Sequence, residues 1–347
     1  MKNRKNEKLF SSLFIFALIT ALAVLVFTDA AGKSEKETEK MSVAMGTVVL
    51  QKLYGKGDKT KESSDIVALI DSLENKISWR KENSVINTLN KTNSAKCDEE
   101  MKEIFEKSLA VYESSGGAFD ITVGKLTTLW NIGEENARVP SKKEIKTALK
   151  YIGSSSLDFR NAEVLSKKGQ LVDLGAVGKG LACDKVREYL ENTDVSGAVI
   201  SVGGSVLLYG KNGKSGWSVA VRDPRGKSEE YMGVLTLDSC CVSTSGDYER
   251  TLEHDGKTYH HIIDTKTGYP SESGLMSVTV VSQSGFMSDA LSTACFVLGK
   301  EKGEKLLCEY GAEGVFIDKN KNVFVTGGLS DKFSLTSDKY KLSGEVR

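Results

Sequence analysis

Residues Gly314–Val325 (GVFIDKNKNVFV) place two short apolar runs on either side of a polar turn. The break at Asp318–Asn322 is typical of an antiparallel hairpin, because polar residues can reverse the chain between two strands. Further β-rich runs lie at Ser42–Tyr54, Ala198–Val202, Val206–Tyr209, Trp217–Val221, Tyr231–Leu237 and Met276–Val281. From Gly197 onward the strands follow one another closely, which favours antiparallel ribbons.

Helices are predicted between these strands without the regular alternation of a parallel βαβ array. Apolar residues recur at helical spacing, or a glycine or capping signal opens the run, in six segments. These segments are Asp65–Ile77, Asp98–Ser114, Ser141–Ile152, Lys179–Leu190, Ser288–Leu298 and Lys302–Tyr310. The pattern predicts an α+β fold with a mixed or antiparallel β-rich lobe, packed helices and an active site between two lobes.

The N-terminus has the layout of a targeting element. Four basic residues precede an apolar run from Leu9 to Phe27, and small residues follow it. Residues 1–31 are predicted to be either a cleaved signal peptide or a retained membrane anchor, and the sequence leaves both open. In both cases the protein is exported to the extracytoplasmic face of the cell membrane. Residues 32–41 are predicted to be a charged linker and residues 42–340 the folded domain.

Composition excludes some classes of protein. Lys plus Arg and Asp plus Glu each total 47 in a chain of 347 residues, so no overall positive field favours nucleic acid as a partner. The six cysteines contain no CxxC pair and no Cys/His spacing suited to zinc. Their positions fix no disulfide pairing.

Three motifs carry candidate chemistry: Asp173–Gly180 (DLGAVGKG), His260–Pro270 (HHIIDTKTGYP) and Ser288–Gly299 (SDALSTACFVLG). Each combines a carboxylate with glycines that would let the backbone approach a ligand. In the third motif Asp289 and Thr293 are four residues apart in a predicted helix, so both side-chain oxygens lie on one face. A carboxylate beside a hydroxyl suits a hard cation such as Mg²⁺. Together the motifs predict a metal–nucleotide site.

Further short blocks occur in order with these motifs. They are Met45–Thr47 (MGT), Gly117–Thr122 (GAFDIT) leading to Trp130, Gly203–Gly204 and Ser243–Tyr248 (STSGDY). The ordered set resembles the ApbE family of FAD:protein FMN transferases over essentially the whole chain after residue 41. The resemblance implies a Mg²⁺-dependent, extracytoplasmic enzyme that transfers FMN from FAD to a threonine hydroxyl of an acceptor and releases AMP. The implied acceptors are flavoproteins of membrane-linked redox systems.

The resemblance also implies roles for individual residues. The flavin and adenine of FAD would be held by Met45, Trp79, Ala118, Phe119, Asp120, Asp173, Lys179 and Ile263. The metal would be bound by the backbone carbonyl of Ala176 and by the side chains of Asp289 and Thr293.

His261 is the candidate base or acid beside the transferred phosphoryl group. The HxxD spacing predicts that the carboxylate of Asp264 orients the imidazole and raises its pKa. His260 would point elsewhere in a strand and is predicted to be structural.

Two other functions remain open from the sequence. The same site with water as the acceptor would make an FAD pyrophosphatase that yields FMN and AMP. A non-catalytic exported flavin-binding protein is the second alternative, although storage of a flavin requires neither a metal nor a base.

Overall fold

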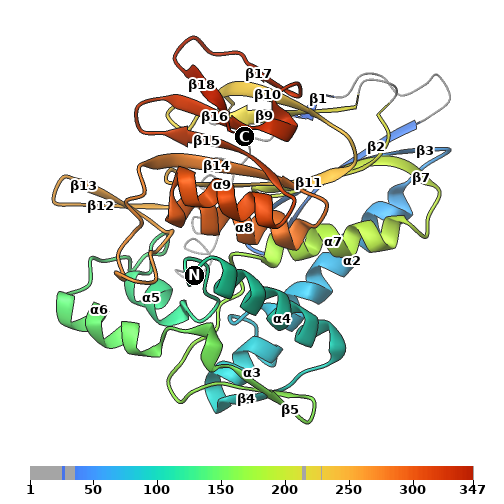
Figure 1. Ribbon diagram of the computed structural model, residues 1–347. Helices are drawn as coiled ribbons and strands as arrows, with labels where there is room; N and C mark the ends of the chain where they lie inside the picture. The colour runs from blue at the N-terminus through green and yellow to red at the C-terminus, as the bar shows by residue number, and fades with distance from the viewer. Residues whose placement is uncertain (1–25, 28–35, 213–215, 228, 347) are drawn as a thin grey trace, which may run out of the picture.

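The structure, a computed structural model, describes residues 26–27, 36–212, 216–227 and 229–346 (Figure 1). The predicted signal peptide or anchor, residues 1–31, lies outside these residues except for Val26–Phe27. Among the helices in the described ranges, none has both the length and the hydrophobicity needed to cross a membrane.

The main sheet has nine strands within the described residues, in the order β18-β16-β15-β14-β11-β8-β7-β3-β2. Only β16 and β18 pair in parallel there, and the other neighbours are antiparallel. The strands are β2 Lys36–Ala44, β3 Thr47–Gly55, β7 Val195–Val202, β8 Ser205–Gly210, β11 Cys240–Gly246, β14 Leu275–Ser282, β15 Glu313–Asp318, β16 Asn322–Thr326 and β18 Lys341–Val346.

Three smaller sheets complete the β-structure of the described residues. A four-stranded sheet orders β1 Val26–Phe27, β9 Trp217–Arg222, β10 Tyr231–Leu237 and β17 Phe333–Leu335. A hairpin joins β12 Thr251–His254 to β13 Lys257–His260, and a small sheet contains β4 Ser94–Lys96, β6 Glu163–Leu165 and β5 Asp158–Arg160.

Helices cover one face of the main sheet. They are α2 Thr60–Ile77, α3 Val85–Thr92, α4 Glu99–Ser114, α5 Gly124–Trp130, α6 Lys142–Ala148, α7 Gly178–Leu190, α8 Gly285–Leu298 and α9 Lys300–Glu309, with short 3₁₀ turns at Leu149–Tyr151, Ser154–Ser156 and Gly327–Leu329. In Figure 1, α7, α8 and α9 lie directly against the main sheet, and α3 to α6 form a further layer below them. The predicted α+β class is confirmed.

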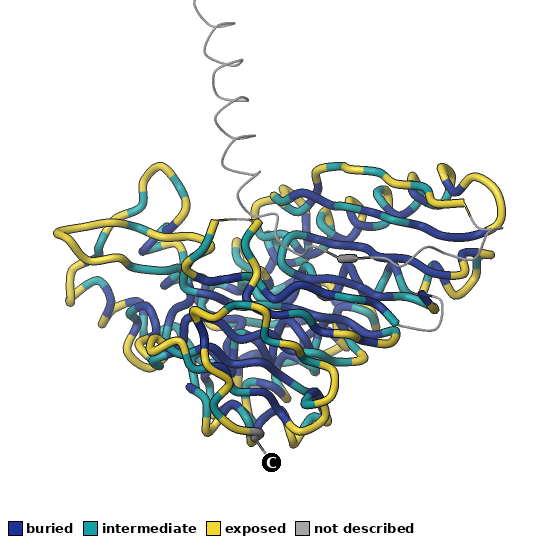
Figure 2. Tube along the Cα trace, turned by 90° about the horizontal axis from the view of Figure 1, so that it is seen from above, coloured by how far each residue is buried: buried dark blue, intermediate teal, exposed yellow. Residues whose placement is uncertain are grey.

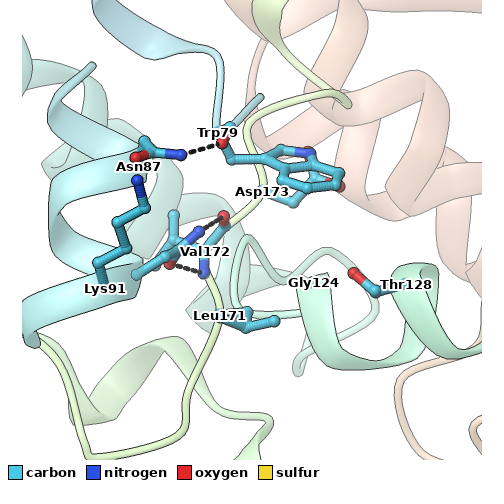
Figure 3. Close-up of a pocket in the computed structure, with 9 residues that line it drawn as sticks. Trp79, Asn87, Lys91, Gly124, Thr128, Leu171, Val172 and Asp173 are labelled. Carbon is cyan, nitrogen blue, oxygen red and sulfur yellow. Dashed lines mark hydrogen bonds between the residues drawn. The ribbon is translucent and has the colours of Figure 1, made fainter. Parts of the chain in front are cut away.

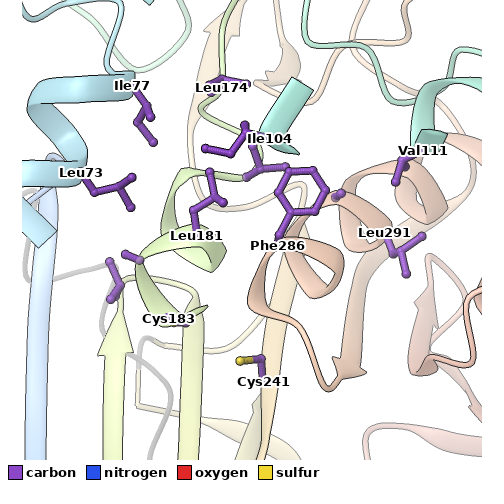
Figure 4. Packing of buried hydrophobic residues seen from close by; sticks show 14 of the residues in the cluster. Leu73, Ile77, Ile104, Val111, Leu174, Leu181, Cys183, Cys241, Phe286 and Leu291 are labelled. Atoms are coloured by element: carbon purple, nitrogen blue, oxygen red, sulfur yellow. The ribbon is translucent and has the colours of Figure 1, made fainter. Parts of the chain in front are cut away.

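Two large apolar cores lie on opposite faces of the main sheet. The first fills the space between the sheet and the helices and includes Leu181, Phe286 and Leu291 (Figure 4). The second lies between the main sheet and the four-stranded sheet and is centred on Trp217 and Met232. The strands between them are buried on both faces, whereas the β12–β13 hairpin is largely exposed (Figure 2).

The adjacent cysteines of β11 belong to different cores. Cys240 packs between the two sheets and Cys241 packs under the helices, as alternation along a strand requires. All six cysteines are free thiols, and Cys308 is the exposed one among them. It lies on the outer side of α9, where the helix faces solvent.

The prediction of a linker at residues 32–41 is wrong for residues 36–41. These residues form most of β2, which pairs along its whole length with β3 from Lys36↔Gly55 to Ala44↔Thr47. The charged residues of this edge strand point to solvent, and Lys52 on β3 lies within ion-pair distance of Glu37 and Glu39. A charged composition is compatible with an edge strand because its outer face stays hydrated.

Candidate functional site

Two glycines set the distance between α7 and α8 at the centre of the site. A Cβ atom on Gly180 would overlap the carbonyl oxygen of Gly285, and one on Gly285 would overlap the carbonyl oxygen of Gly180. The sequence predicted that the glycines of DLGAVGKG admit a ligand. At Gly180 the absence of a side chain instead lets two helix backbones come into contact.

The start of α8 is fixed by α7. The carboxylate of Asp184 accepts hydrogen bonds from the backbone N–H groups of Gly285 (2.6 Å) and Phe286 (2.8 Å). The hydroxyl of Ser284 caps the first turn by accepting from the N–H of Met287. The helix therefore begins at Gly285, three residues before the predicted start, and Asp289 lies in its second turn and not at its cap.

Asp289 is buried and its carboxylate joins three elements. Oδ2 accepts from the N–H of Gly180 in the first turn of α7 at 2.6 Å, and Oδ1 accepts from the hydroxyl of Ser205 at the start of β8 at 2.5 Å. Each carboxylate oxygen has two lone pairs, so one acceptor site on each oxygen remains for a further ligand.

The other two predicted metal ligands lie on α8 and in the loop before α7. Thr293 follows Asp289 by one helical turn, and its hydroxyl lies 3.4 Å from the hydroxyl of Ser245 on β11. Ala176 is in the loop that leads into α7 and is partly buried. The described residues contain no cluster of three or more His, Cys, Asp or Glu side chains suited to a metal. The proposed donor set of Asp289, Thr293 and Ala176 contains one carboxylate, so it is not a cluster of that type. Its donors are a carboxylate, a hydroxyl and a carbonyl oxygen, which are the ligands that a hard cation prefers.

His261 does not have the environment that the HxxD spacing predicted. The carboxylate of Asp264 accepts from the backbone N–H of Lys266 (2.9 Å) within its own turn and does not bond to the imidazole. Burial, followed by the positive charges of Arg250, His260 and Lys179, lowers the pKa of His261 to about 3. The prediction of a raised pKa is therefore wrong, because burial disfavours the charged imidazolium and the charges that act on it are positive.

The buried Nδ1 atom of His261 has no hydrogen-bond partner among the described residues. A covered polar atom without a partner costs about 1–3 kcal/mol, which is unusual outside functional sites. His260 behaves as predicted: its Nε2 lies 2.9 Å from the carbonyl oxygen of Ser271, and its ring packs edge-on against Phe296. The two neighbouring histidines thus have different roles.

The lowered pKa of His261 predicts a pH-dependent loss of stability. The imidazole of His261 takes up a proton near pH 6.5 in the unfolded chain but only near pH 3 in the folded chain. This residue therefore does not reduce the free energy of unfolding above pH 6.5, and it reduces it progressively as the pH falls from 6.5 towards 3. Between pH 7 and pH 5 the wild-type free energy of unfolding should fall by roughly 1–2 kcal/mol more than that of His261→Asn. Urea denaturation at both pH values measures the difference. Parallel losses in the two proteins would contradict the assignment.

Trp79 and Asp173 line a pocket of about 200 Å³ beside the loop that precedes α7 (Figure 3). The partly buried indole is next to Arg80, whose guanidinium carbon lies 4.8 Å from the ring centroid. Asn87 donates to the backbone carbonyl of Trp79 at 2.7 Å and so fixes this segment. The remaining lining residues are Asn90, Lys91, Gly124, Thr128, Leu171 and Val172. The pocket presents an aromatic face, a carboxylate and a cation to a ligand.

Asp173 is held in place by its backbone and its side chain. Its N–H donates to the carbonyl of Ile121 at 2.7 Å, and its carboxylate accepts from the N–H of Gly175 (2.8 Å) and the hydroxyl of Thr127 (3.2 Å). Because Ile121 belongs to the GAFDIT block, the two motifs are directly connected.

The GAFDIT residues lie behind the pocket wall and not on its surface. Ala118, Phe119 and Asp120 are buried. The carboxylate of Asp120 accepts from the N–H and hydroxyl of Thr122 (2.7 and 2.6 Å) and from the hydroxyl of Ser154 (2.6 Å). Asp120 therefore stabilises its own turn through these hydrogen bonds. Ala118, Phe119 and Asp120 support the pocket wall and do not line the pocket.

Met45 and Lys179 lie at the start of α7. Met45 has a positive φ of 52°, its N–H donates to the carboxylate of Glu74, and its Cε atom is 3.7 Å from the position that a Cβ would take on Gly178. Lys179 is in the first helical turn, where the backbone N–H groups also favour an anion. Ile263 is buried in a separate small core with Trp130 and forms a bridge with Pro270.

Three features of the site were not predicted from the sequence. Arg250 lies beside His261, whose N–H donates to its carbonyl at 3.2 Å, and its aliphatic stem packs over Gly133, which has a φ of 93°. Ser205 and Gly180 supply the donors to Asp289. Arg250 could have been suspected from its position two residues after the STSGDY block, whereas Ser205 gives no such signal.

A family model described as the ApbE family matches residues 45–316. This chain belongs to the ApbE family. A protein of Treponema pallidum named FAD:protein FMN transferase is 32% identical over 336 residues, which covers 88% of this chain and 91% of that protein. Lys179, His261 and Asp289 all lie within the matched residues.

Solved structures of ApbE proteins have the same fold. The ApbE protein of Thermotoga maritima matches with a TM-score of 0.75 at 34% identity, covering 83% of this chain and 96% of that one. The apo form of the flavinyl transferase ApbE of Pseudomonas stutzeri matches with a TM-score of 0.73 at 28% identity, covering 82% of this chain and 92% of that one.

Proposed function

We propose that this chain is an FAD:protein FMN transferase, which uses Mg²⁺ to move FMN from FAD to a threonine hydroxyl of an acceptor flavoprotein and releases AMP. The observation that carries the proposal is the buried carboxylate of Asp289, which binds the N–H of Gly180 at the start of α7, directly after Lys179, in an ApbE chain. The charge of Lys179 also acts on His261. The name of the Treponema pallidum relative supports the same activity.

The pyrophosphate of FAD would bind where α7 begins. Lys179 and Arg250 supply positive charge, and the dipole of α7 adds a partial positive charge at this end of the helix. The partly buried indole of Trp79 offers a face on which a flavin or adenine ring can stack. Met45, Ala118, Phe119, Asp120, Asp173 and Ile263 are proposed to shape or support the ring sites.

Mg²⁺ would be held by Asp289, Thr293 and the carbonyl of Ala176. When bound, it would neutralise charge on the pyrophosphate and on the departing AMP. The residues themselves mainly position the two phosphoryl groups, which is the principal task of a protein in phosphoryl transfer. His261, neutral near pH 7, is proposed to lie beside the transferred phosphoryl group and to contact one of its oxygens.

One incubation tests the proposed reaction. The purified protein is mixed with FAD, Mg²⁺ and a candidate acceptor, and intact-protein mass spectrometry follows the acceptor. We expect the acceptor to gain the mass of FMN while AMP appears in equal amount, and a chelator to stop both. An acceptor whose target threonine is replaced by valine is the matched control.

Two other results would contradict the proposed transfer. Free FMN and AMP with an unmodified acceptor would make the protein an FAD pyrophosphatase. Intact FAD that remains bound after long incubation would make it a flavin-binding protein without catalysis.

The proposed location is the extracytoplasmic face of the cell membrane, to which residues 1–31 would bring the protein as a signal peptide or an anchor. The proposed partner there is an acceptor flavoprotein of a membrane-linked redox system. The apolar run from Leu9 to Phe27 supports this location. Protease added to intact cells should degrade the protein, and full protection while the cells stay intact would contradict the location.

A further inference from the structure

Asn90 on α3 lines the pocket beside Trp79 and holds one of its walls through a side-chain amide. Its Nδ2 donates to the backbone carbonyl of Val172 at 2.9 Å, and its Oδ1 accepts from the backbone N–H of Val172 at 2.7 Å (dashed lines at Val172 in Figure 3). Val172 directly precedes Asp173, which lines the same pocket. Asn90 thus binds the backbone next to a proposed FAD contact, although none of the motifs includes it.

The chain at Val172 and Asp173 is hydrogen-bonded on two sides. The N–H of Asp173 donates to the carbonyl of Ile121 at 2.7 Å, whereas both backbone groups of Val172 bond to Asn90. Backbone groups of successive residues alternate in this way between the two edges of a strand. A primary amide carries a donor and an acceptor, so it can pair with an N–H and a C=O as a neighbouring strand would. Asn90 therefore takes the place of a paired strand on one edge.

Helix α3 also binds the opposite wall of the pocket. Asn87, three residues before Asn90 and so on the same side of the helix, donates to the backbone carbonyl of Trp79 at 2.7 Å (Figure 3). The buried apolar residues of α3 belong to the core between the main sheet and the helices, so the helix is a fixed support. Its two asparagines therefore set the position of Trp79 relative to Asp173.

We propose that Asn90 is a positioning residue for FAD binding, which acts by holding Val172 so that the Asp173 carboxylate is in place before FAD arrives. A contact residue that is already ordered loses less conformational freedom when the ligand binds, so the complex is tighter. The inference rests on the proposed function, in which Asp173 contacts FAD, and adds the residue that fixes this contact. Loss of Asn90 should therefore weaken FAD binding in a way that depends on Asp173.

The test measures FAD binding by isothermal titration calorimetry in chelator-treated buffer, so that no Mg²⁺-dependent reaction takes place. Asn90→Ala removes both hydrogen bonds to Val172, and we expect the Kd of FAD to rise by about tenfold. In the Asp173→Ala background no carboxylate is left to position. There the same substitution should change the Kd by less than about twofold. A general loss of stability would not depend on Asp173 in this way.

Thr92→Ala is the matched control on the same helix. The Thr92 hydroxyl also bonds to the backbone, at the carbonyl oxygens of Thr88 (2.9 Å) and Ser94 (2.6 Å), but Thr92 is not one of the described residues that line the pocket. This variant should bind FAD with the wild-type Kd. Urea denaturation compares the stability of all variants. If Asn90→Ala does not fold, Asn90→Ser, which leaves a smaller gap and keeps a polar group, is measured in both backgrounds.

Three binding results would overturn the assignment. An unchanged Kd for Asn90→Ala would make Asn90 a structural residue alone. An equal rise in both backgrounds would mean that Asn90 acts independently of Asp173. Wild-type binding by Asp173→Ala itself would mean that no contact at Asp173 needs positioning. If the wild-type protein binds no FAD, the proposed function and the inference both fail. If it binds FAD but modifies no acceptor, only the proposed transfer fails, and the Kd values still decide the role of Asn90.

Discussion

Asp289→Asn is expected to lower the rate of FMN transfer by at least about a hundredfold while the protein stays folded. The variant removes the negative charge proposed to hold Mg²⁺, whose stabilisation of a phosphoryl transition state is worth several kcal/mol. The fold should tolerate asparagine, because its Oδ1 can accept from Gly180 and its Nδ2 can donate to the Ser205 hydroxyl. Steady-state rates against Mg²⁺ concentration and urea denaturation measure the two effects.

Asp289→Ala separates the charge from the hydrogen bonds. Alanine leaves the buried N–H of Gly180 and the hydroxyl of Ser205 without their acceptor, at about 1–3 kcal/mol each. We therefore expect the alanine variant to lose both activity and stability, and the asparagine variant mainly activity. Wild-type transfer by Asp289→Asn in chelator-treated buffer would show that the cation is not bound there.

Gly180→Ala is expected to destabilise the protein by about 1–2 kcal/mol. Alanine in a helix interior gains roughly 0.5–1 kcal/mol over glycine. The new methyl group, however, would overlap the backbone carbonyl of Gly285, and inserting an atom into a packed helix contact costs about 1–3 kcal/mol or more. A backbone group cannot rotate away as a side chain can, so the clash outweighs the gain. Thermal and urea denaturation measure the loss.

Gly178→Ala, two residues earlier on the same helix, is the matched control. A Cβ at this position would meet only the side-chain ends of Ile77 (3.5 Å) and Met45 (3.7 Å), which are ordinary contacts. Its stability should stay within about 0.5 kcal/mol of wild type or rise slightly. Equal losses in the two variants would mean that the contact between α7 and α8 does not determine the stability of this region.

Local patterns predicted the elements that their own residues specify. The hairpin quoted from Gly314–Val325 is β15 and β16, and Tyr231–Leu237 is β10 with the predicted bounds. Central strand β11 was not predicted as a strand, because its serines, threonine and glycine resemble a turn. It pairs on both edges with β8 and β14, so tertiary pairing overrides local preference.

The sequence patterns also failed to predict short elements, such as α3, whose local contacts are too weak to stabilise them alone. Helix α3 has only eight residues, with Ser84 as its N-cap and Asn93 in the left-handed conformation after its end. Helices of this length are marginal alone and depend on burying a few apolar residues, here Ile86 and Leu89. The sequence shows the caps but not the surface against which the helix packs.

The sequence by itself determined the family, the α+β class and the shared helix face of Asp289 and Thr293, because each depends on residue order and helical spacing. Only the tertiary structure decided that Gly180 and Ser205 bind Asp289, and that burial and nearby positive charge, not Asp264, set the pKa of His261. The reason is physical. Spacing fixes which side chains share an element, whereas hydrogen bonds and charge effects act between elements whose distance only the packed fold sets.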